Sequence, residues 1–302
     1  MTMPGDIGAI DLMISFPKSN ASKTYDYLRE TTRGDDESTK EFPAGYMFKD
    51  VPNKLDEGDD GVTVTIGEMD KWGVDMGLVG AGPLTKQAQE RYPGRFITSL
   101  EIDPNDITGT VRKIRQYKEE YDLKALTTFP AGCNPQVPVD DRRYYPIYQE
   151  CIDLDIPIIS NAGIAGPRFP SKCQDVMLFD QVCYDFPELR IVMRHGAEPW
   201  EELAVKLMLK WPNLYYMPSA FAPKHYPEAI IKYANTRGAD KVMYAGYYPM
   251  GLSLERIFAE MPNVPFRDHV WPKFLRDNAI RVFNLDARPY SPTAYASTAE
   301  AS

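Results

Sequence analysis

Short apolar runs rich in β-branched residues alternate along the chain with longer segments of helical periodicity. The runs predict buried strands, and the segments between them predict amphipathic helices. The predicted strands are 7–16, 74–80, 96–102, 123–129, 156–161, 189–195, 213–218 and 241–246. The predicted helices are 85–92, 106–121, 143–154, 171–186, 199–210, 227–237 and 253–260. This regular alternation is typical of βα units and a parallel sheet.

Eight such units in 302 residues favour a single α/β domain over 1–302, a (β/α)8 TIM barrel. The alternative, a doubly wound sheet, normally has a glycine-rich phosphate turn after an early strand, and Pro-Lys-Ser-Asn follows the first strand here. Two segments fall outside the repeat. A polar insertion at about 18–62 is expected to be a lid, a subunit contact or a solvated decoration. The small polar tail at about 286–302 is expected to be disordered or to pack on a neighbouring subunit.

The net charge of −9 disfavours nucleic acid and anionic membranes as partners. The four cysteines form no CxxC pair and are too few for a disulfide framework, which favours a reducing compartment. No run approaches the roughly 20 apolar residues of a membrane span, and the N-terminus has no leader pattern. We therefore expect a cytoplasmic protein with a small-molecule substrate.

One of only three histidines, His195, ends the predicted strand 189–195 and precedes a glycine. In TIM barrels the chemistry lies at the C-terminal ends of the strands. A histidine with an ordinary pKa near 6.5 both takes and gives protons at neutral pH. We expect His195 to be a general acid or base, the alternative being an idle side chain that is only hydrogen-bonded at the end of the barrel.

Five stretches resemble, in their order and spacing, the amidohydrolase-2 branch of the amidohydrolase superfamily, which includes aminocarboxymuconate semialdehyde decarboxylase. They are 70–79, 92–97 with 102–104, 155–163, 187–196 and 277–285. The likeness runs from about residue 7 to 285. It implies a distorted TIM barrel, a reaction at the C-terminal ends of the strands, and a homodimer or homotetramer.

The same family usually holds a divalent metal between an HxH pair, two further histidines and an aspartate. At the matching positions this chain has Met13 and Ser15, then Asn161, His195 and Tyr247. A zinc site needs about three ligands from His, Asp, Glu or Cys, and thioether, hydroxyl, amide and neutral phenol groups are poor substitutes. The sequence therefore predicts no metal and no other cofactor.

Other residues near these positions are candidates for catalysis. Asp11 shares one side of the predicted first strand with Met13 and Ser15, and is either a catalytic partner of His195 or only held by backbone donors. Tyr247 is predicted to stabilise an oxyanion, or else fills the space of the lost metal. Two alternatives are a metal held by Asp11, His195 and Glu101, and a nucleophilic Cys133 after the fourth strand.

Five residues are predicted to contact substrate. They are Ser15, Asn161, Met13, Arg168 and Tyr248. Arg168 lies after the fifth strand, where a cation can hold a carboxylate, although most loop cations are solvated. Tyr248 is equally suited to packing.

Together these features predict a metal-independent member of the amidohydrolase family. It would be a hydrolase or a decarboxylase-type lyase acting on a small carboxylated or cyclic metabolite. The alternative is a catalytically inactive barrel that binds a ligand or serves as a scaffold.

Overall fold

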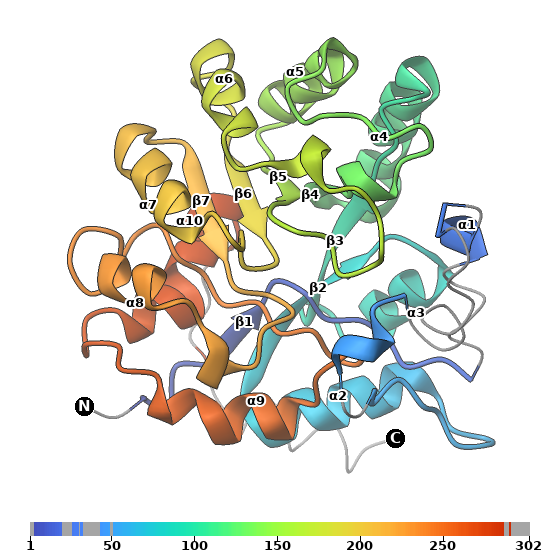
Figure 1. Cartoon of the computed structure of the whole chain (residues 1–302). Helices are drawn as coiled ribbons and strands as arrows, with labels where there is room; N and C mark the ends of the chain where they lie inside the picture. Colours follow the sequence, from blue (N-terminus) through green and yellow to red (C-terminus); the bar gives the residue numbers. More distant parts are fainter. Residues whose placement is uncertain are drawn as a thin grey trace.

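A computed structural model describes residues 3–19, 26–29, 31–32, 43–48, 51–286 and 290. Seven parallel strands form one sheet in the order β1 to β7 and curl around a common centre, with helices outside them (Figure 1). The strands are β1 Ala9–Asp11, β2 Val74–Gly80, β3 Phe96–Glu101, β4 Leu123–Thr128, β5 Ile158–Asn161, β6 Ile191–Arg194 and β7 Leu214–Met217. This architecture confirms the predicted α/β fold of the TIM-barrel type.

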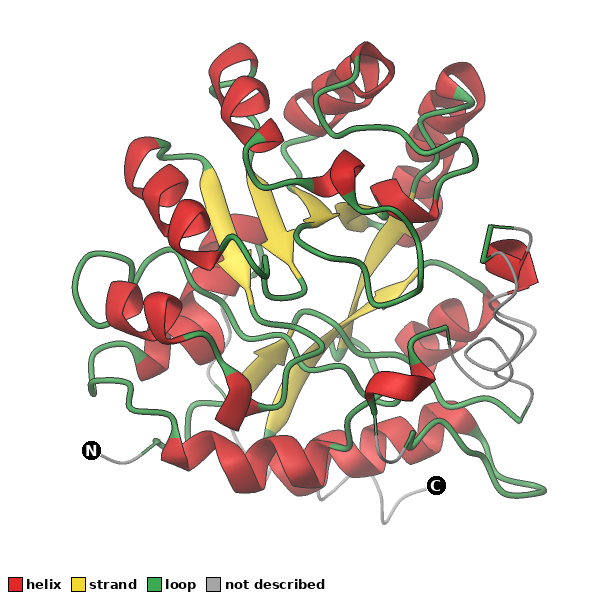
Figure 2. Ribbon diagram, viewed as in Figure 1, coloured by secondary structure: helices red, strands yellow, loops and turns green. Residues whose placement is uncertain are grey.

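Most helices follow the strands as predicted and form the outer ring (Figure 2). The helices are α1 Asp26–Arg29, α2 Gly61–Trp72, α3 Pro83–Arg91, α4 Ile107–Tyr121, α5 Tyr145–Asp153, α6 Leu178–Asp185, α7 Glu201–Lys210, α8 Glu228–Ala234, α9 Leu254–Glu260 and α10 Asn278–Phe283. No helix of the described segments is long and apolar enough to cross a bilayer.

The periodicity did not predict α1, α2 or α10. Helix α2 is capped at its N-terminus by Asp60, whose carboxylate accepts hydrogen bonds from Val62 N and Thr63 N, and at its C-terminus by Gly73 in the left-handed conformation. An acidic N-cap and a C-terminal glycine are ordinary helix boundaries. Most of the predicted tail lies outside the described residues.

The inside of the barrel is apolar. One cluster of buried side chains takes members from every strand and from the 241–246 segment. Its members there are Ile10, Leu12, Met76, Leu78, Ile97, Ala125, Ile159, Val192, Tyr215, Met217, Met243 and Ala245. Side chains of α10, including Val282 and Phe283, belong to the same cluster. Because residues alternate between the two faces of a strand, these members identify which side chains point inward.

The prediction of an eighth strand at 241–246 is wrong. The segment makes only isolated bridges, Tyr216 with Val242 and Ile14 with Tyr248. Two backbone amides that would continue a ladder are bonded elsewhere: Tyr244 N donates to Phe274 O at 2.8 Å, and Gly246 N to the Asp11 carboxylate at 2.8 Å. The segment 241–248 therefore closes the barrel between β7 and β1 without forming a regular ladder.

The predicted first strand, 7–16, is also too long. The strand β1 ends at Asp11, whose side chain accepts a hydrogen bond from Met13 N at 2.9 Å. The chain bends at residues 12 and 13. This local bond between a side chain and the backbone competes with the strand ladder and ends the strand early.

Gly246 allows the close approach between the closing segment and β1. A Cβ at this position would lie 2.5 Å from Asp11 Oδ2 and 3.1 Å from the Tyr244 hydroxyl. We expect Gly246→Ala to lower the free energy of unfolding by about 1–3 kcal/mol, because buried neighbours must move. Urea denaturation measures this effect. Gly80→Ala is the control, since a Cβ there meets nothing within 4 Å; equal losses in both variants would contradict the steric explanation.

Candidate active site

A buried polar layer lies above the apolar interior, at the C-terminal ends of the strands. Two residues beyond members of the apolar cluster, where the side chain again points inward, the chain carries four polar side chains and one tyrosine. They are Thr127, Asn161, Arg194, Ser219 and Tyr247, and all are buried. The polar side chains are thus concentrated at the C-terminal end of the barrel, where TIM-barrel enzymes have their active sites.

His195 follows β6 directly and leaves the strand direction, with φ at 69°. Its ring nitrogen Nδ1 lies 3.1 Å from the hydroxyl of Ser219, and its backbone amide donates to the same hydroxyl at 3.3 Å. The ring meets that of Tyr247 edge-on, with centroids 5.4 Å apart. Ser219, which follows β7, and Tyr247 of the closing segment therefore hold the half-buried imidazole in place.

The imidazole is neutral at physiological pH. Burial, and next the positive charge of Arg194, lower the pKa of His195 to about 3, while the Ser219 carbonyl opposes the shift. A neutral imidazole with Nδ1 fixed presents its other nitrogen, Nε2, for hydrogen bonding or for taking up a proton.

Arg194 is the functional candidate that the sequence analysis missed. It is the last residue of β6, is buried, and lies two residues beyond Val192, a member of the inward-facing cluster. Its Nε donates a hydrogen bond to Oδ1 of Asn161, its register partner on β5. The sequence contained a signal for this residue. Alternate residues of a strand share a face, so Arg194 shares the inward face with Val192, whereas His195 does not.

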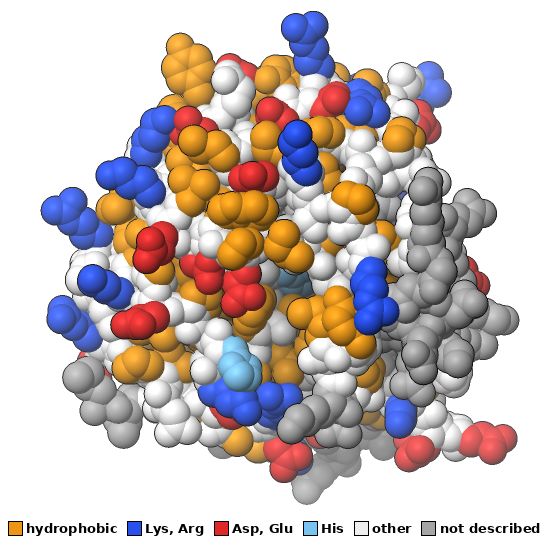
Figure 3. Space-filling model, viewed as in Figure 1, with side chains coloured by type: hydrophobic (Ala, Val, Ile, Leu, Met, Phe, Trp, Pro, Cys, Tyr) orange, Lys and Arg blue, Asp and Glu red, His pale blue; other side chains and the backbone are white. Residues whose placement is uncertain are grey.

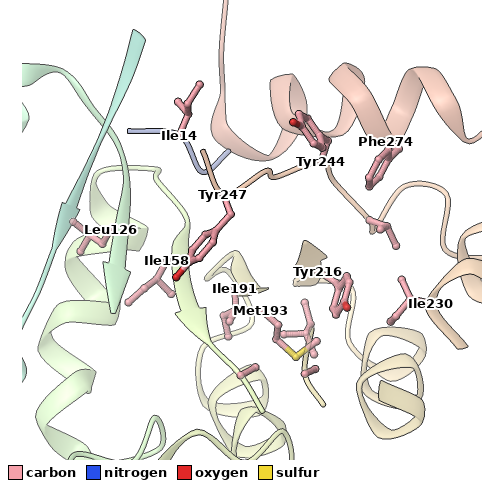
Figure 4. Close-up of a cluster of buried hydrophobic side chains, with 14 of the residues drawn as sticks. Ile14, Leu126, Ile158, Ile191, Met193, Tyr216, Ile230, Tyr244, Tyr247 and Phe274 are labelled. Carbon is pink, nitrogen blue, oxygen red and sulfur yellow. The ribbon is translucent and has the colours of Figure 1, made fainter. Parts of the chain in front are cut away.

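Tyr247 projects over the strands from the closing segment, whereas Tyr244 of the same segment points towards Phe274 (Figure 4). The ring of Tyr247 also stacks on Phe48 of the insertion at 5.7 Å. The structure therefore brings His195 and Tyr247 together and places one part of the insertion directly on Tyr247.

The neighbouring residues of the insertion contact the loop after β5. The Tyr46 hydroxyl donates to Gly166 O at 2.6 Å, and the guanidinium of Arg168 lies 4.4 Å from the centre of the Tyr46 ring. Arg168 is exposed and lies over the insertion. Hydrophobic side chains gather around the centre of this face, with acidic side chains beside them (Figure 3).

Asp11 is placed differently from the prediction that it faces the same side as Met13 and Ser15. Its neighbours Ile10 and Leu12 point into the barrel, while Asp11 itself is fully buried on the other face of β1. Its carboxylate accepts from Met13 N, Gly246 N and the Tyr244 hydroxyl. Burial raises the pKa of Asp11 to about 6 against the effect of these bonds. The carboxylate thus joins β1 to the closing segment.

The other predicted contacts lie around the rim. Met13 is half-buried against the inward-facing apolar cluster and against a second group of buried side chains that includes Ile14. Tyr248 is buried and pairs with Ile14. Ser15 lines a cleft of about 960 Å³, together with the exposed Glu101 and with Cys133. Burial raises the pKa of the Cys133 thiol to about 12, so this cysteine is a poor nucleophile.

The residues at the expected metal positions do not fit a divalent ion. The amide oxygen of Asn161, at one of these positions, already accepts a hydrogen bond from the Arg194 guanidinium. Within the described segments, no group of three or more His, Cys, Asp or Glu side chains is arranged to hold a metal. The alternative site of Asp11, His195 and Glu101 is therefore wrong, since these side chains do not cluster.

Solved structures share this fold. An uncharacterised TIM-barrel protein from Bordetella bronchiseptica has a TM-score of 0.71 at 21% identity, covering 92% of this chain and 98% of its own. The 5-carboxyvanillate decarboxylase of Novosphingobium aromaticivorans, solved with manganese and a nitrobenzoic acid, has 0.66 at 18%, covering 94% and 98%. The 2,6-dihydroxybenzoate decarboxylase from Rhizobium has 0.64 at 14%, covering 93% and 99%.

None of the curated proteins matches this sequence. At these identities the structural neighbours establish the fold and nothing more. The family model described as amidohydrolase, Amidohydro_2, matches residues 51–285, which include β2 to β7 and the closing segment. The chain therefore belongs to the amidohydrolase family.

Proposed function

We propose that the protein is a metal-independent enzyme of the decarboxylase type that acts on a small carboxylated, ring-containing metabolite. The observation that carries this proposal is the pairing of His195 with Tyr247 at the C-terminal end of the barrel, with Ser219 fixing the imidazole. The decarboxylases with the same fold support the choice of reaction class.

In such a reaction the bond between the carbon skeleton and the carboxylate breaks. Carbon dioxide leaves, and the electron pair stays on the carbon, which then takes a proton. His195 would deliver that proton from its imidazolium form. A bound anion raises the pKa of a neighbouring histidine, so an anionic substrate would promote protonation of His195 on binding. Tyr247 would donate a hydrogen bond to an oxygen on which negative charge develops.

Hydrolysis of a lactone, ester or amide is the alternative reaction. It requires the neutral imidazole of His195 to accept a proton from water.

The test is to incubate the purified protein, in EDTA, with 5-carboxyvanillate, 2,6-dihydroxybenzoate and a set of aryl lactones and esters. We expect at least one carboxylated ring to release carbon dioxide, detected by ¹³C NMR. Hydrolysis of esters or lactones alone would instead assign a hydrolase. Decarboxylation that appears only after addition of manganese would contradict metal independence.

A second candidate function is ligand binding without catalysis. It is favoured by the stacking of Phe48 on Tyr247, which covers the ring proposed for catalysis. The substitution Phe48→Ala separates the two functions. If the protein is an enzyme and the insertion acts as its lid, Phe48→Ala changes the KM. If it is a binding protein, neither the wild type nor the variant shows turnover.

A further inference from the structure

We infer that the buried hydroxyl of Ser219 donates its proton to Nδ1 of His195 and so keeps the other ring nitrogen, Nε2, protonated. Ser219 is then a positioning residue, and His195 meets a bound molecule as a hydrogen-bond donor and an acid, not as a base. The inference deepens the proposed function, on which its meaning for the reaction rests, because it assigns the direction in which the proton moves at the same site.

The hydroxyl of Ser219 has two contacts, and both are with His195. Its oxygen accepts a hydrogen bond from the His195 backbone amide at 3.3 Å and lies 3.1 Å from Nδ1 of the ring. Ser219 is fully buried, and within the described part of the chain its hydroxyl has no further hydrogen-bond partner. The backbone amide is only a donor, so Nδ1 is the one acceptor that the hydroxyl proton can reach.

The two neutral forms of the imidazole differ in what they leave unpaired, because a neutral ring carries its proton on one nitrogen only. With the proton on Nε2, Nδ1 accepts the hydroxyl proton of Ser219. With the proton on Nδ1, that N–H would donate to the Ser219 carbonyl, 3.4 Å away, and the hydroxyl proton would be buried without an acceptor. Buried hydroxyl groups without a partner are rare, because nothing replaces their lost bonds to water. The contacts therefore favour the form protonated on Nε2.

Nε2 lies on the open side of the ring. Within the described segments it has no hydrogen-bond partner, and it is not one of the buried, unpaired side-chain atoms there, which are Trp72 Nε1 and Asn213 Oδ1. The nitrogen is therefore accessible, and its proton is available to an acceptor on a bound molecule.

The loops that carry the two residues are fixed against each other. The hydroxyl of Tyr216 on β7 donates to Gly196 O at 3.0 Å. A Cβ on Gly196 would lie 2.3 Å from the ring of Phe221, so the loop after β6 packs directly on the loop after β7. The contact between His195 and Ser219 is thus supported by the backbone on both sides.

This arrangement suits proton donation and opposes base catalysis. In the neutral ring Nε2 already carries a proton and Nδ1 is engaged by Ser219, so neither nitrogen is free to take a proton from water. In the imidazolium form Nδ1 donates to the Ser219 carbonyl, and Nε2 still carries its proton. Transfer of that proton to carbon forms a C–H bond with the electron pair left by carbon dioxide. The ring is then neutral and protonated on Nδ1.

NMR of the ring nitrogens tests the inference on the wild-type protein without a substrate. The chain has only three histidines, His195, His225 and His269, so histidine-selective ¹⁵N labelling gives three sets of ring signals. The set that is missing from His195→Asn belongs to His195. At pH 7.5, where this ring is neutral, we expect Nε2 to have the chemical shift of a protonated nitrogen and Nδ1 that of an acceptor. The opposite pattern would overturn the inference.

Ser219→Ala removes the hydroxyl but leaves the carbonyl, so the proton of His195 should move to Nδ1 and the pattern of shifts should reverse. Ser219→Thr keeps a hydroxyl and should retain the wild-type pattern. The matched control is Ser160→Ala, which removes another buried hydroxyl and should change nothing at His195. An unchanged pattern in a folded Ser219→Ala variant would overturn the role of Ser219. Thermal denaturation confirms the folding of each variant, and the wild-type pattern decides the question if Ser219→Ala does not fold.

These outcomes are separable from those of the proposed function. A proton on Nε2 without turnover of any substrate would retire the enzyme and leave the assignment of Ser219. Decarboxylation by a protein whose neutral His195 carries its proton on Nδ1 would retire the assignment and leave the enzyme. Hydrolysis of an ester or lactone that is lost in His195→Asn would also overturn the assignment, because that reaction needs the ring as a base.

Discussion

The substitution His195→Asn is expected to lower kcat by about 10²- to 10⁴-fold, the usual contribution of a general acid or base. Asparagine is chosen for two structural reasons. It tolerates the left-handed backbone found at this residue, where φ is 69°, better than alanine does. Its amide can also keep a hydrogen bond with Ser219 in place of Nδ1.

Steady-state kinetics on the substrate found in the decarboxylation assay measures this effect, and thermal denaturation confirms the fold. His269→Asn is the matched control, because His269 is an exposed histidine in a surface turn. An unchanged kcat in the His195 variant would show that the residue is hydrogen-bonded but idle.

The same variant should resist acid better than the wild type. The pKa of His195 is lowered from 6.5 to about 3 in the folded protein, so the unfolded chain binds a proton in this window that the folded chain does not. The free energy of unfolding therefore falls as the pH drops from 6.5 towards 3. In His195→Asn this contribution is absent, which urea denaturation at pH 7 and pH 5 would detect as a smaller decrease.

The second large effect is expected on the free energy of unfolding and comes from Asp11. Its pKa is raised from 3.8 to about 6, so the folded protein holds a proton between these values that the unfolded chain has lost. Stability from this residue is therefore present below about pH 4 and is lost as the pH rises through 6. The shift corresponds to about 3 kcal/mol as an order of magnitude.

Asp11→Asn should remove this penalty and raise the free energy of unfolding at pH 7.5 by up to about 3 kcal/mol. The amide oxygen can accept from both Met13 N and Gly246 N, and the amide nitrogen can donate to the Tyr244 hydroxyl. Asp11→Ala should instead destabilise, since each buried group left without a partner costs about 1–3 kcal/mol.

Urea denaturation across pH 4 to 8 distinguishes the two variants, with the exposed Asp59→Asn as control. The same proteins test the prediction that Asp11 is catalytic. A folded Asp11→Asn variant with lost turnover and unchanged stability would establish a catalytic carboxylate. Retained turnover would establish that the group joins β1 to the closing segment.

The periodicity of apolar positions was sufficient to predict the strands β2 to β7 and the helices between them. Each of these elements buries one face or both, so its apolar residues recur with a period of two or of about 3.6 residues or form a continuous run. The same signal failed at 7–16 and 241–246. At 7–16 a local hydrogen bond from Met13 N to the Asp11 carboxylate ends the strand. At 241–246 the amides of Tyr244 and Gly246 donate to Phe274 O and to Asp11, which are remote in the chain.

The sequence alone determined the fold class, the family resemblance, and the loss of metal-binding residues at 13, 15, 161 and 247, because each depends on residue types and their spacing. It also placed His195 at the end of a strand. Only the tertiary structure decided the surroundings of that residue: Ser219 on its ring nitrogen, Tyr247 across its edge, and Arg194 bonded to Asn161. Those contacts join segments that are remote in the chain and meet only through strand pairing and closure of the barrel, so no local pattern along the chain could reveal them.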